Sequence, residues 1–173
     1  MQLAELEPML PVEVLFDMRY ATTNNVLGEV LYRGEDAVPR LDEPAAKALV
    51  YAAELLIYQG FRPVIWDAFR PKPIQARLTA FNRDPHYVLD VESSNHPKGL
   101  AVDLTLADMQ GNLLDMGTDF DNFTPLAHAG NTELDWQPRS KRGVLAKQME
   151  SAGFRQWPYE WWHFDFLKPP PNR

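Results

Sequence analysis

The chain has 173 residues and a formal net charge of −7, and it contains no cysteine. The lack of cysteine excludes a disulfide framework, a Cys-ligated zinc site, an iron–sulfur cluster and a thiol nucleophile. The acidic balance argues against a nucleic-acid partner, because neutralising phosphates requires a surplus of Lys and Arg. We therefore expect one compact domain over residues 1–173, in which His and carboxylate side chains would hold any metal.

The two ends of the chain carry no pattern typical of export or membrane insertion. Residues 1–10 include two acidic residues and no basic one, whereas a secretory signal begins with a basic segment followed by an apolar one. No window approaches the roughly 18 uninterrupted apolar residues of a membrane span. We expect a cytoplasmic protein without a membrane partner. The proline-rich end, residues 168–173, is expected to be a loose tail.

The first predicted element is a helix between Asp42 and Gly60. Its apolar residues recur at helical spacing, Asp42 could cap its first turn, Pro44 fits that turn, and Gly60 suits the position after its end. The residues that follow predict a strand over 62–66 and then a short helix over about 74–81.

The second half of the chain predicts more strands and one more helix. A β-rich segment, 100–106, is followed by a turn over 108–111 that suggests a hairpin into 113–114. A helix is predicted over 140–152, and the segment 160–166 is dense in aromatic residues. Helices and hairpins without a regular βαβ alternation predict an α+β fold, with a central antiparallel sheet flanked by helices.

Two of the four histidines stand in segments that suggest chemistry. His96 lies in a loop that runs into the strand residue Asp103, and a chain that doubles back at Gly99 can bring the imidazole and the carboxylate together. A carboxylate on a sheet face needs a partner, which a metal would supply. The same spacing also occurs between purely structural residues. The other two, His86 and His128, are interpreted as surface or loop histidines.

The second informative segment contains Glu160 and His163. Side chains three residues apart face opposite ways in a regular strand, so we expect a bend near Trp161 if both serve one site. Two His and one carboxylate with an open fourth position form a catalytic zinc arrangement, and a second Glu nearby can take a proton from water. The adjacent Trp161 and Trp162 are interpreted as core and pocket wall.

Arg70 follows the predicted strand 62–66 at a turn. The simpler interpretation is a structural ion pair with Asp67 or another acid. A fixed guanidinium could equally polarise a carbonyl and hold the oxyanion that forms when water attacks it. The sequence alone leaves both interpretations open.

Several linked motifs resemble those of a known family. Ser94, His96, Gly99, Ala101 and Asp103 match a Ser-x-His-x-x-Gly-x-Ala-x-Asp motif, Glu160 and His163 match Glu-x-x-His, and Arg70 stands in a Phe-Arg-Pro context. Residues 17–22 and 115–121 are also similar. In order and spacing, the chain resembles the D-alanyl-D-alanine dipeptidases of the VanX type, within the zinc D-Ala-D-Ala metallopeptidases, from about residue 17 to 166.

The resemblance implies a hedgehog/D-Ala-D-Ala peptidase-like fold with a site for one Zn²⁺ per chain at the sheet. The implied ligands are His96, Asp103 and His163. Glu160 would act as general base toward the attacking water and return the proton to the leaving amine, and Arg70 would stabilise the tetrahedral intermediate.

The same resemblance implies that Tyr20, Ser94 and Asp121 line the dipeptide site, with Asp121 facing the free amine. The expected partner is a small D,D-dipeptide, and the expected reaction is hydrolysis of D-Ala-D-Ala to two D-Ala. Recycling of D-alanine and depletion of the dipeptide under glycopeptide pressure are both compatible with it. The oligomeric state is left open.

Two alternatives belong to other functional classes. A D,D-carboxypeptidase acting on cell-wall peptides would need export and an open groove. A non-catalytic, zinc-stabilised binding module would have no reason to keep Glu160 beside His163.

Overall fold

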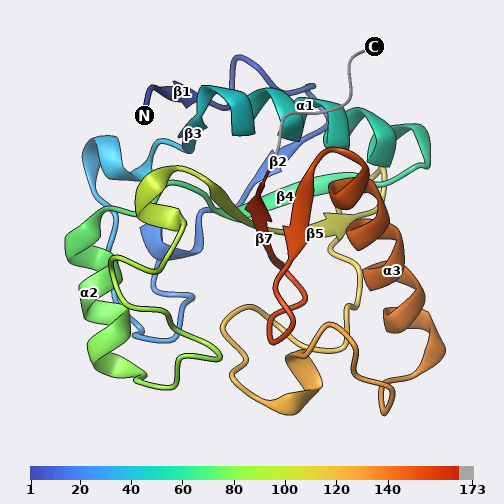
Figure 1. The fold of residues 1–173 in the computed structure, drawn as a ribbon. Helices are drawn as coiled ribbons and strands as arrows, with labels where there is room; N and C mark the ends of the chain where they lie inside the picture. The colour runs from blue at the N-terminus through green and yellow to red at the C-terminus, as the bar shows by residue number, and fades with distance from the viewer. Residues whose placement is uncertain (168–173) are drawn as a thin grey trace.

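The structure is a computed structural model that describes residues 1–167. The tail expected over 168–173 lies outside the described residues, and a single domain over the whole chain stays a prediction. The α-helices are α1 (Glu43–Tyr58), α2 (Lys72–Phe81) and α3 (Trp136–Ser151). The strands are β1 (Leu3–Glu5), β2 (Leu15–Phe16), β3 (Arg40–Asp42), β4 (Arg62–Asp67), β5 (Ala101–Ala107), β6 (Phe154–Gln156) and β7 (His163–Phe166). Their arrangement is shown in Figure 1.

The main sheet has five strands in the order β2-β4-β5-β7-β6. Its three pairs β4–β5, β5–β7 and β6–β7 are antiparallel, as the sequence predicts, and the α+β class is confirmed. The edge pair β2–β4 is parallel, so the sheet is mixed. This strand escapes sequence analysis because it has only two residues, and its connection to β4 passes through β3 and α1, which lets it arrive in the same direction.

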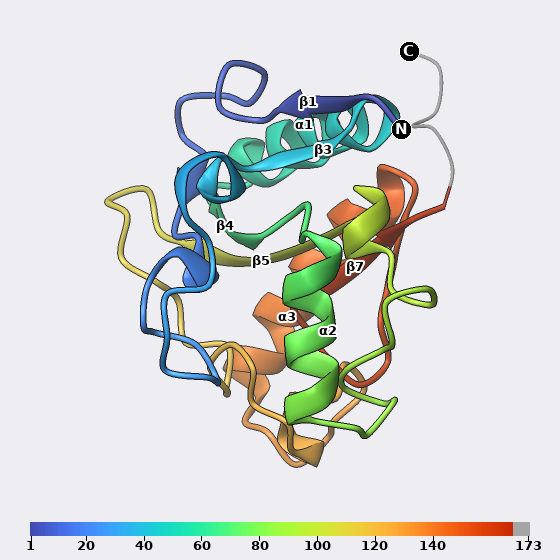
Figure 2. The same ribbon diagram turned by 90° about the vertical axis from the view of Figure 1, so that its left-hand side faces the viewer.

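The elements form layers around the five-stranded sheet. Helix α1 and the small antiparallel β1–β3 sheet lie on one side, whereas α2 and the long loops lie on the other (Figure 2). The face of α1 that is buried is lined mostly by alanine and leucine, which lets the helix approach closely. Trp161 and Trp162 are 0% and 1% exposed, so their interpretation as core residues is confirmed. Within residues 1–167, the structure contains no helix long and apolar enough to cross a membrane.

All three α-helices differ from the predictions at their starts, and α2 begins at Lys72, two residues before the predicted start. Asp42 precedes α1 but does not cap it with its side chain: the carboxylate accepts a hydrogen bond from the backbone N–H of Gln2, at 2.7 Å, because Asp42 ends β3 beside the N-terminal strand. Helix α3 begins at Trp136, four residues before the predicted start. Pro138 lies in the first turn, where a missing N–H costs no helical hydrogen bond.

Two turns position the strand β5. Before it, Gly99 adopts φ +67°, and a Cβ there would lie 2.8 Å from the backbone nitrogen of Asp42. A side chain is therefore excluded, and the chain doubles back as predicted. After β5, the carboxylate of Asp108 accepts the backbone N–H groups of Gln110 and Asn112, both at 2.9 Å. The predicted hairpin is reduced to one bridge, between Ala107 and Leu113.

The register of the sheet places three ionisable residues in one row. Asp103 on β5 pairs with Asp67 on β4 and with His163 on β7. A bulge in β4 between Ile65 and Asp67 creates this row, because regular pairing beyond Ile65 would place Trp66 opposite Asp103. The bulge thus brings a second carboxylate next to the first.

Candidate active site

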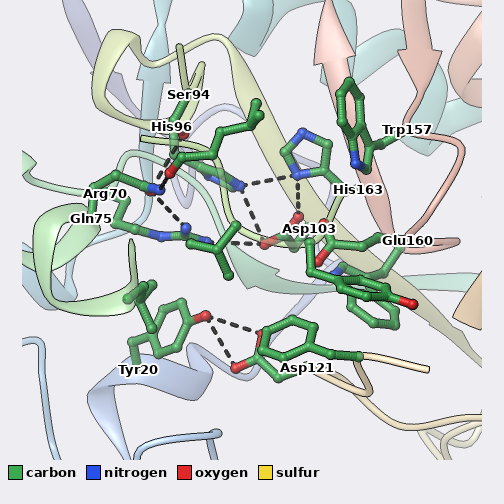
Figure 3. A pocket seen from close by; sticks show the side chains of 16 residues that line it. Tyr20, Arg70, Gln75, Ser94, His96, Asp103, Asp121, Trp157, Glu160 and His163 are labelled. Atoms are coloured by element: carbon green, nitrogen blue, oxygen red, sulfur yellow. Dashed lines mark hydrogen bonds and ion pairs between the residues drawn. The ribbon is translucent and has the colours of Figure 1, made fainter. Parts of the chain in front are cut away.

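A pocket opens beside this row, between the sheet and α2 (Figure 3). Its polar wall combines side chains from distant parts of the chain: Tyr20, Arg70, Gln75, Ser94, His96, Asp103, Asp121, Glu160 and His163. Leucine, valine and aromatic side chains complete the lining. All eight residues that the sequence analysis assigns to the site line this one pocket. Their individual roles stay predictions.

His96, Asp103 and His163 form the centre of the pocket. Nε2 of His96 lies 3.2 Å from Nδ1 of His163, which lies 2.9 Å from Oδ1 of Asp103. Nε2 of His96 also lies 3.3 Å from Oδ2 of Asp103. Within residues 1–167, these three buried residues form the one group of His and carboxylate side chains compact enough to hold a metal ion.

The outer nitrogen of each imidazole has its own partner. Nδ1 of His96 lies 2.7 Å from the carbonyl oxygen of Ala68, to which it can only donate, so Nε2 keeps its lone pair. Nε2 of His163 lies 3.2 Å from Oδ1 of Asp165. Both rings therefore present the nitrogen needed for a metal toward the same point as Asp103.

The charges at this centre are strongly coupled in the metal-free protein. Burial opposes the charged form of His163, but its hydrogen bonds to Asp103 and Asp165 outweigh that effect and raise its pKa to about 10. For Asp103, burial acts upward, yet the neighbouring His96 and His163 hold its pKa well below the usual range. A cation in the centre is thus favoured, whether a proton or a metal ion.

Glu160 enters the pocket from a turn. The backbone N–H of His163 bonds to the carbonyl of Glu160 at 3.3 Å, which is the bend expected near Trp161. The carboxylate of Glu160 is buried and accepts no hydrogen bond from any residue among 1–167. Burial raises its pKa well above the ordinary value. A carboxyl group whose pKa is raised by burial suits proton transfer.

Arg70 combines both interpretations that the sequence left open. Its guanidinium bonds to Asp67 through Nε, at 2.8 Å, and through Nη2, at 2.7 Å, so the structural ion pair exists. The same side chain lines the pocket, and its Nη2 lies 3.4 Å from Oδ2 of Asp103. A structural ion pair therefore holds a cationic donor beside the reaction centre.

Asp121 and Tyr20 lie together in another part of the pocket wall. The Tyr20 hydroxyl is 3.1 Å from both carboxylate oxygens of Asp121 (Figure 3). Burial raises the pKa of Asp121 to about 7, although Arg70 acts in the opposite direction. Asp121 also adopts φ +55°, an uncommon conformation for a residue other than glycine. This backbone conformation belongs to a residue that turns its carboxylate toward the cavity.

Three residues near the centre were not assigned to the site from the sequence. Asp67 was considered only as a partner of Arg70, whereas Gln75 and Asp165 were not considered. For Asp165 a signal exists: it lies two residues after His163, on the same face of a strand. Gln75 had no such signal, because it comes from α2, an element linked to the row only by the fold.

The two remaining histidines are not among the residues that line the pocket. His86 is exposed and its Nδ1 is 2.8 Å from Asp84, whereas Nε2 of His128 is 3.0 Å from the hydroxyl of Tyr87. The ring of Tyr159 contacts both histidines. Their interpretation as loop histidines is confirmed.

Comparisons with known proteins agree on one family. The model of the family described as D-ala-D-ala dipeptidase, Peptidase_M15, matches residues 1–172. The D-alanyl-D-alanine dipeptidase of Escherichia coli K12 is 36% identical over 165 residues, covering 95% of this chain and 84% of that protein. The protein of the same name from Enterococcus faecium is 29% identical over 182 residues, covering 92% and 89% of the two chains.

A solved structure is similar in fold. It is the vancomycin-resistance D,D-pentapeptidase VanY in complex with Zn(II), with a TM-score of 0.53 and 14% sequence identity over 76% of this chain and 75% of that one. At this identity the similarity supports the fold alone.

Proposed function

The chain belongs to the family of D-Ala-D-Ala dipeptidases, and from that premise we propose that its pocket hydrolyses D-Ala-D-Ala to two molecules of D-Ala. One structural observation carries the proposal. His96, Asp103 and His163 meet in a buried cluster, and Glu160 lines the same pocket. This is the residue set that hydrolysis with a metal and a general base requires.

The central cluster fits one Zn²⁺ per chain. Tetrahedral coordination with bonds of about 2.0–2.1 Å separates ligand atoms by about 3.4 Å. Here the two imidazole nitrogens lie 3.2 Å apart, and each lies 2.9 or 3.3 Å from one oxygen of Asp103, Oδ1 for His163 and Oδ2 for His96. Two facing imidazole nitrogens and a carboxylate also need a shared cation between them. When bound, zinc supplies Lewis acidity, which lowers the pKa of water to about 7 and polarises a carbonyl.

Glu160 acts as the general base. Its carboxylate takes a proton from the attacking water and then gives that proton to the amine nitrogen of the leaving D-Ala. The burial that raises its pKa makes the carboxylate a stronger acceptor for the proton of the attacking water. The absence of a hydrogen-bond partner among the described residues leaves its oxygens available for this transfer.

Arg70 stabilises the negative charge that develops on the carbonyl oxygen during the attack. Its guanidinium is buried and cannot lose its proton, since Asp67 holds its pKa high despite the burial. A fixed cationic donor of this kind typically contributes about 3–4 kcal/mol to transition-state binding.

Asp121 binds the free amine of the dipeptide. A substrate ammonium group would neutralise a carboxylate that is otherwise buried beside Tyr20. Ser94, whose hydroxyl is buried in the pocket, contributes a further polar contact. This arrangement favours a dipeptide over the D,D-carboxypeptidase alternative, because an N-acylated peptide has no ammonium group to form an ion pair with Asp121.

Rates of D-Ala release test this proposal. The purified protein, after metal analysis, is assayed with D-Ala-D-Ala, with L-Ala-L-Ala and with an N-blocked pentapeptide that ends in D-Ala-D-Ala. We expect about one zinc per chain and turnover of D-Ala-D-Ala only. Preference for the blocked pentapeptide would support the carboxypeptidase alternative, and zinc binding without turnover would support a binding module. The cytoplasmic location stays a prediction.

A further inference from the structure

The guanidinium of Arg70 is held on three sides. Oδ2 of Asp67 accepts a hydrogen bond from Nε at 2.8 Å and forms an ion pair with Nη2 at 2.7 Å, and Oε1 of Gln75 accepts a hydrogen bond from Nη1 at 2.8 Å. The ring of Tyr20 faces the guanidinium carbon at 5.0 Å from the ring centroid. The plane of the group is therefore fixed by contacts at two edges and at one face.

The five N–H donors of Arg70 can be assigned one by one. Asp67 takes the Nε donor and also forms an ion pair with Nη2, and Gln75 takes one Nη1 donor. The one hydrogen bond that Nη2 makes within residues 1–167 is the long one of 3.4 Å to Asp103. The second Nη1 donor has no acceptor among residues 1–167. One Nη1 donor and the weakly held Nη2 donor thus stay available for a substrate.

We propose that Asp67 and Gln75 are positioning residues, which orient Arg70 so that its two remaining N–H donors meet the oxyanion formed from the substrate carbonyl. This inference rests on the proposed function and extends it to two residues that act through Arg70. Without them, the flexible side chain of Arg70 would be free to swing toward the carboxylate of Asp103.

Asp67 is itself rigidly held. It is 0% exposed, and its other oxygen, Oδ1, accepts the hydroxyl of Tyr32 at 2.7 Å and the backbone N–H of Ala68 at 2.9 Å. The bulge in β4 places it opposite Asp103. Arg70 consequently bridges two adjacent buried carboxylates, and the shorter contacts, to Asp67, decide where the guanidinium lies.

The amide of Gln75 is oriented from its other end. Its Nε2 donates to the carbonyl of Leu89 at 2.6 Å, which turns Oε1 toward Arg70. The hydroxyl of Ser94 adds a weaker contact to Oε1, at 3.3 Å. Because Gln75 is 1% exposed, water cannot replace these bonds when the side chain is changed.

A kinetic double-mutant cycle tests the proposal. Asp67→Asn keeps the size of the side chain but can place an amide N–H against the guanidinium, and Gln75→Met removes the acceptor for Nη1. We expect each to lower kcat for D-Ala-D-Ala by about 10- to 100-fold, with KM changed less than about threefold. In an Arg70→Ala background, neither substitution should lower kcat further, because the group they orient is gone.

Inhibition by a phosphinate analogue of the tetrahedral intermediate separates positioning from general damage. In each variant the inhibition constant should rise by the same factor by which kcat/KM falls, whereas the zinc content should stay unchanged. The matched control is Asp17→Asn, which removes the negative charge from the 2.7 Å contact between Asp17 and Arg19 outside this pocket and should leave kcat unaltered.

The outcomes distinguish the two proposals. A parent protein that does not hydrolyse D-Ala-D-Ala refutes the proposed function. An active parent whose Asp67→Asn and Gln75→Met variants keep full kcat, or lose the same factor again in the Arg70→Ala background, refutes the positioning role. If Asp67→Asn fails to fold, the Gln75→Met cycle alone decides, since it removes only the contact at Nη1.

Discussion

The ring nitrogen Nε2 of His163 lies 3.2 Å from the carboxylate oxygen Oδ1 of Asp165, on the same face of β7. Asp165 is also fixed from the other side, because Asn95 donates to the same oxygen at 3.0 Å. A carboxylate that accepts the outer N–H of a histidine sets its tautomer and strengthens the inner nitrogen as a metal ligand. The inner nitrogen here is the one that faces Asp103 and His96.

Replacing Asp165 should therefore weaken zinc binding without removing a ligand. We expect Asp165→Leu to raise the dissociation constant for Zn²⁺ by about 10- to 100-fold. Asp165→Asn should have a smaller effect, because its amide oxygen can still accept the hydrogen bond. Competition with a chromophoric chelator measures both values on the metal-free protein. Equal affinities in the parent and the Leu variant would contradict this role.

Glu160→Gln should abolish most of the activity and leave the metal site intact. The amide keeps the shape of the side chain but cannot accept a proton from water, so we expect kcat to fall by at least about 10²–10⁴-fold. Zinc content, measured by metal analysis, should equal that of the parent. Glu150→Gln, an exposed change on α3, is the matched control and should retain full activity. Turnover near the parental level in the Glu160 variant would remove this residue from the mechanism.

The pKa of Asp121 predicts how the stability of the metal-free protein depends on pH. Burial raises this pKa to about 7. Asp103 also raises it, whereas Arg70 and the hydrogen bond from Tyr20 lower it. The folded state therefore binds a proton that the unfolded chain releases near pH 4. This contribution is fully present below about pH 4 and is lost as the pH rises toward 7.

Thermal unfolding of Asp121→Asn tests the sign of this effect. The amide carries no charge, so the variant should unfold at a higher temperature than the parent at pH 8, and the difference should vanish near pH 4. Scans of both metal-free proteins across this range measure it. A variant that is less stable than the parent at pH 8 would mean that the ionised carboxylate is stabilised by its surroundings.

Local sequence patterns predicted most of the elements and the site residues, whereas they did not predict which residues of distant strands pair with each other. The spacing of His96, Gly99 and Asp103 predicted a loop that doubles back into a strand, and the φ of Gly99 agrees. That Asp67 and Asp103 are neighbours in the row was not predictable, because a bulge in β4 determines this pairing. A bulge depends on how two strands pair, and no periodicity in either strand records it.

The same limit applies to Gln75 and to the edge strand β2. Gln75 reaches Arg70 because α2 packs beside the turn that follows β4, which is a tertiary relationship. The two residues of β2 are too few to show alternation. Family motifs, by contrast, indicated Tyr20 and Asp121, which come together from positions 101 residues apart.

Arg142 should contribute strongly to stability through the loops near the pocket. This residue of α3 is 3% exposed and donates to the carbonyl oxygens of Met116, Leu126 and His128 at 2.7, 3.0 and 3.2 Å. Its guanidinium also faces the ring of Trp161, the neighbour of Glu160, at 5.2 Å. Burial lowers its pKa to about 10, but it remains charged at neutral pH.

Arg142→Met would keep the aliphatic packing and leave these carbonyl groups without their donor. Because an unsatisfied buried acceptor costs about 1–3 kcal/mol, we expect the free energy of unfolding to fall by at least about 2–4 kcal/mol. Denaturant titration measures it, with Arg139→Met, an exposed residue on the same helix, as the control that should change little. A decrease in the free energy of unfolding no larger than that of the control would mean that water or neighbouring groups donate hydrogen bonds to the loop carbonyls without Arg142.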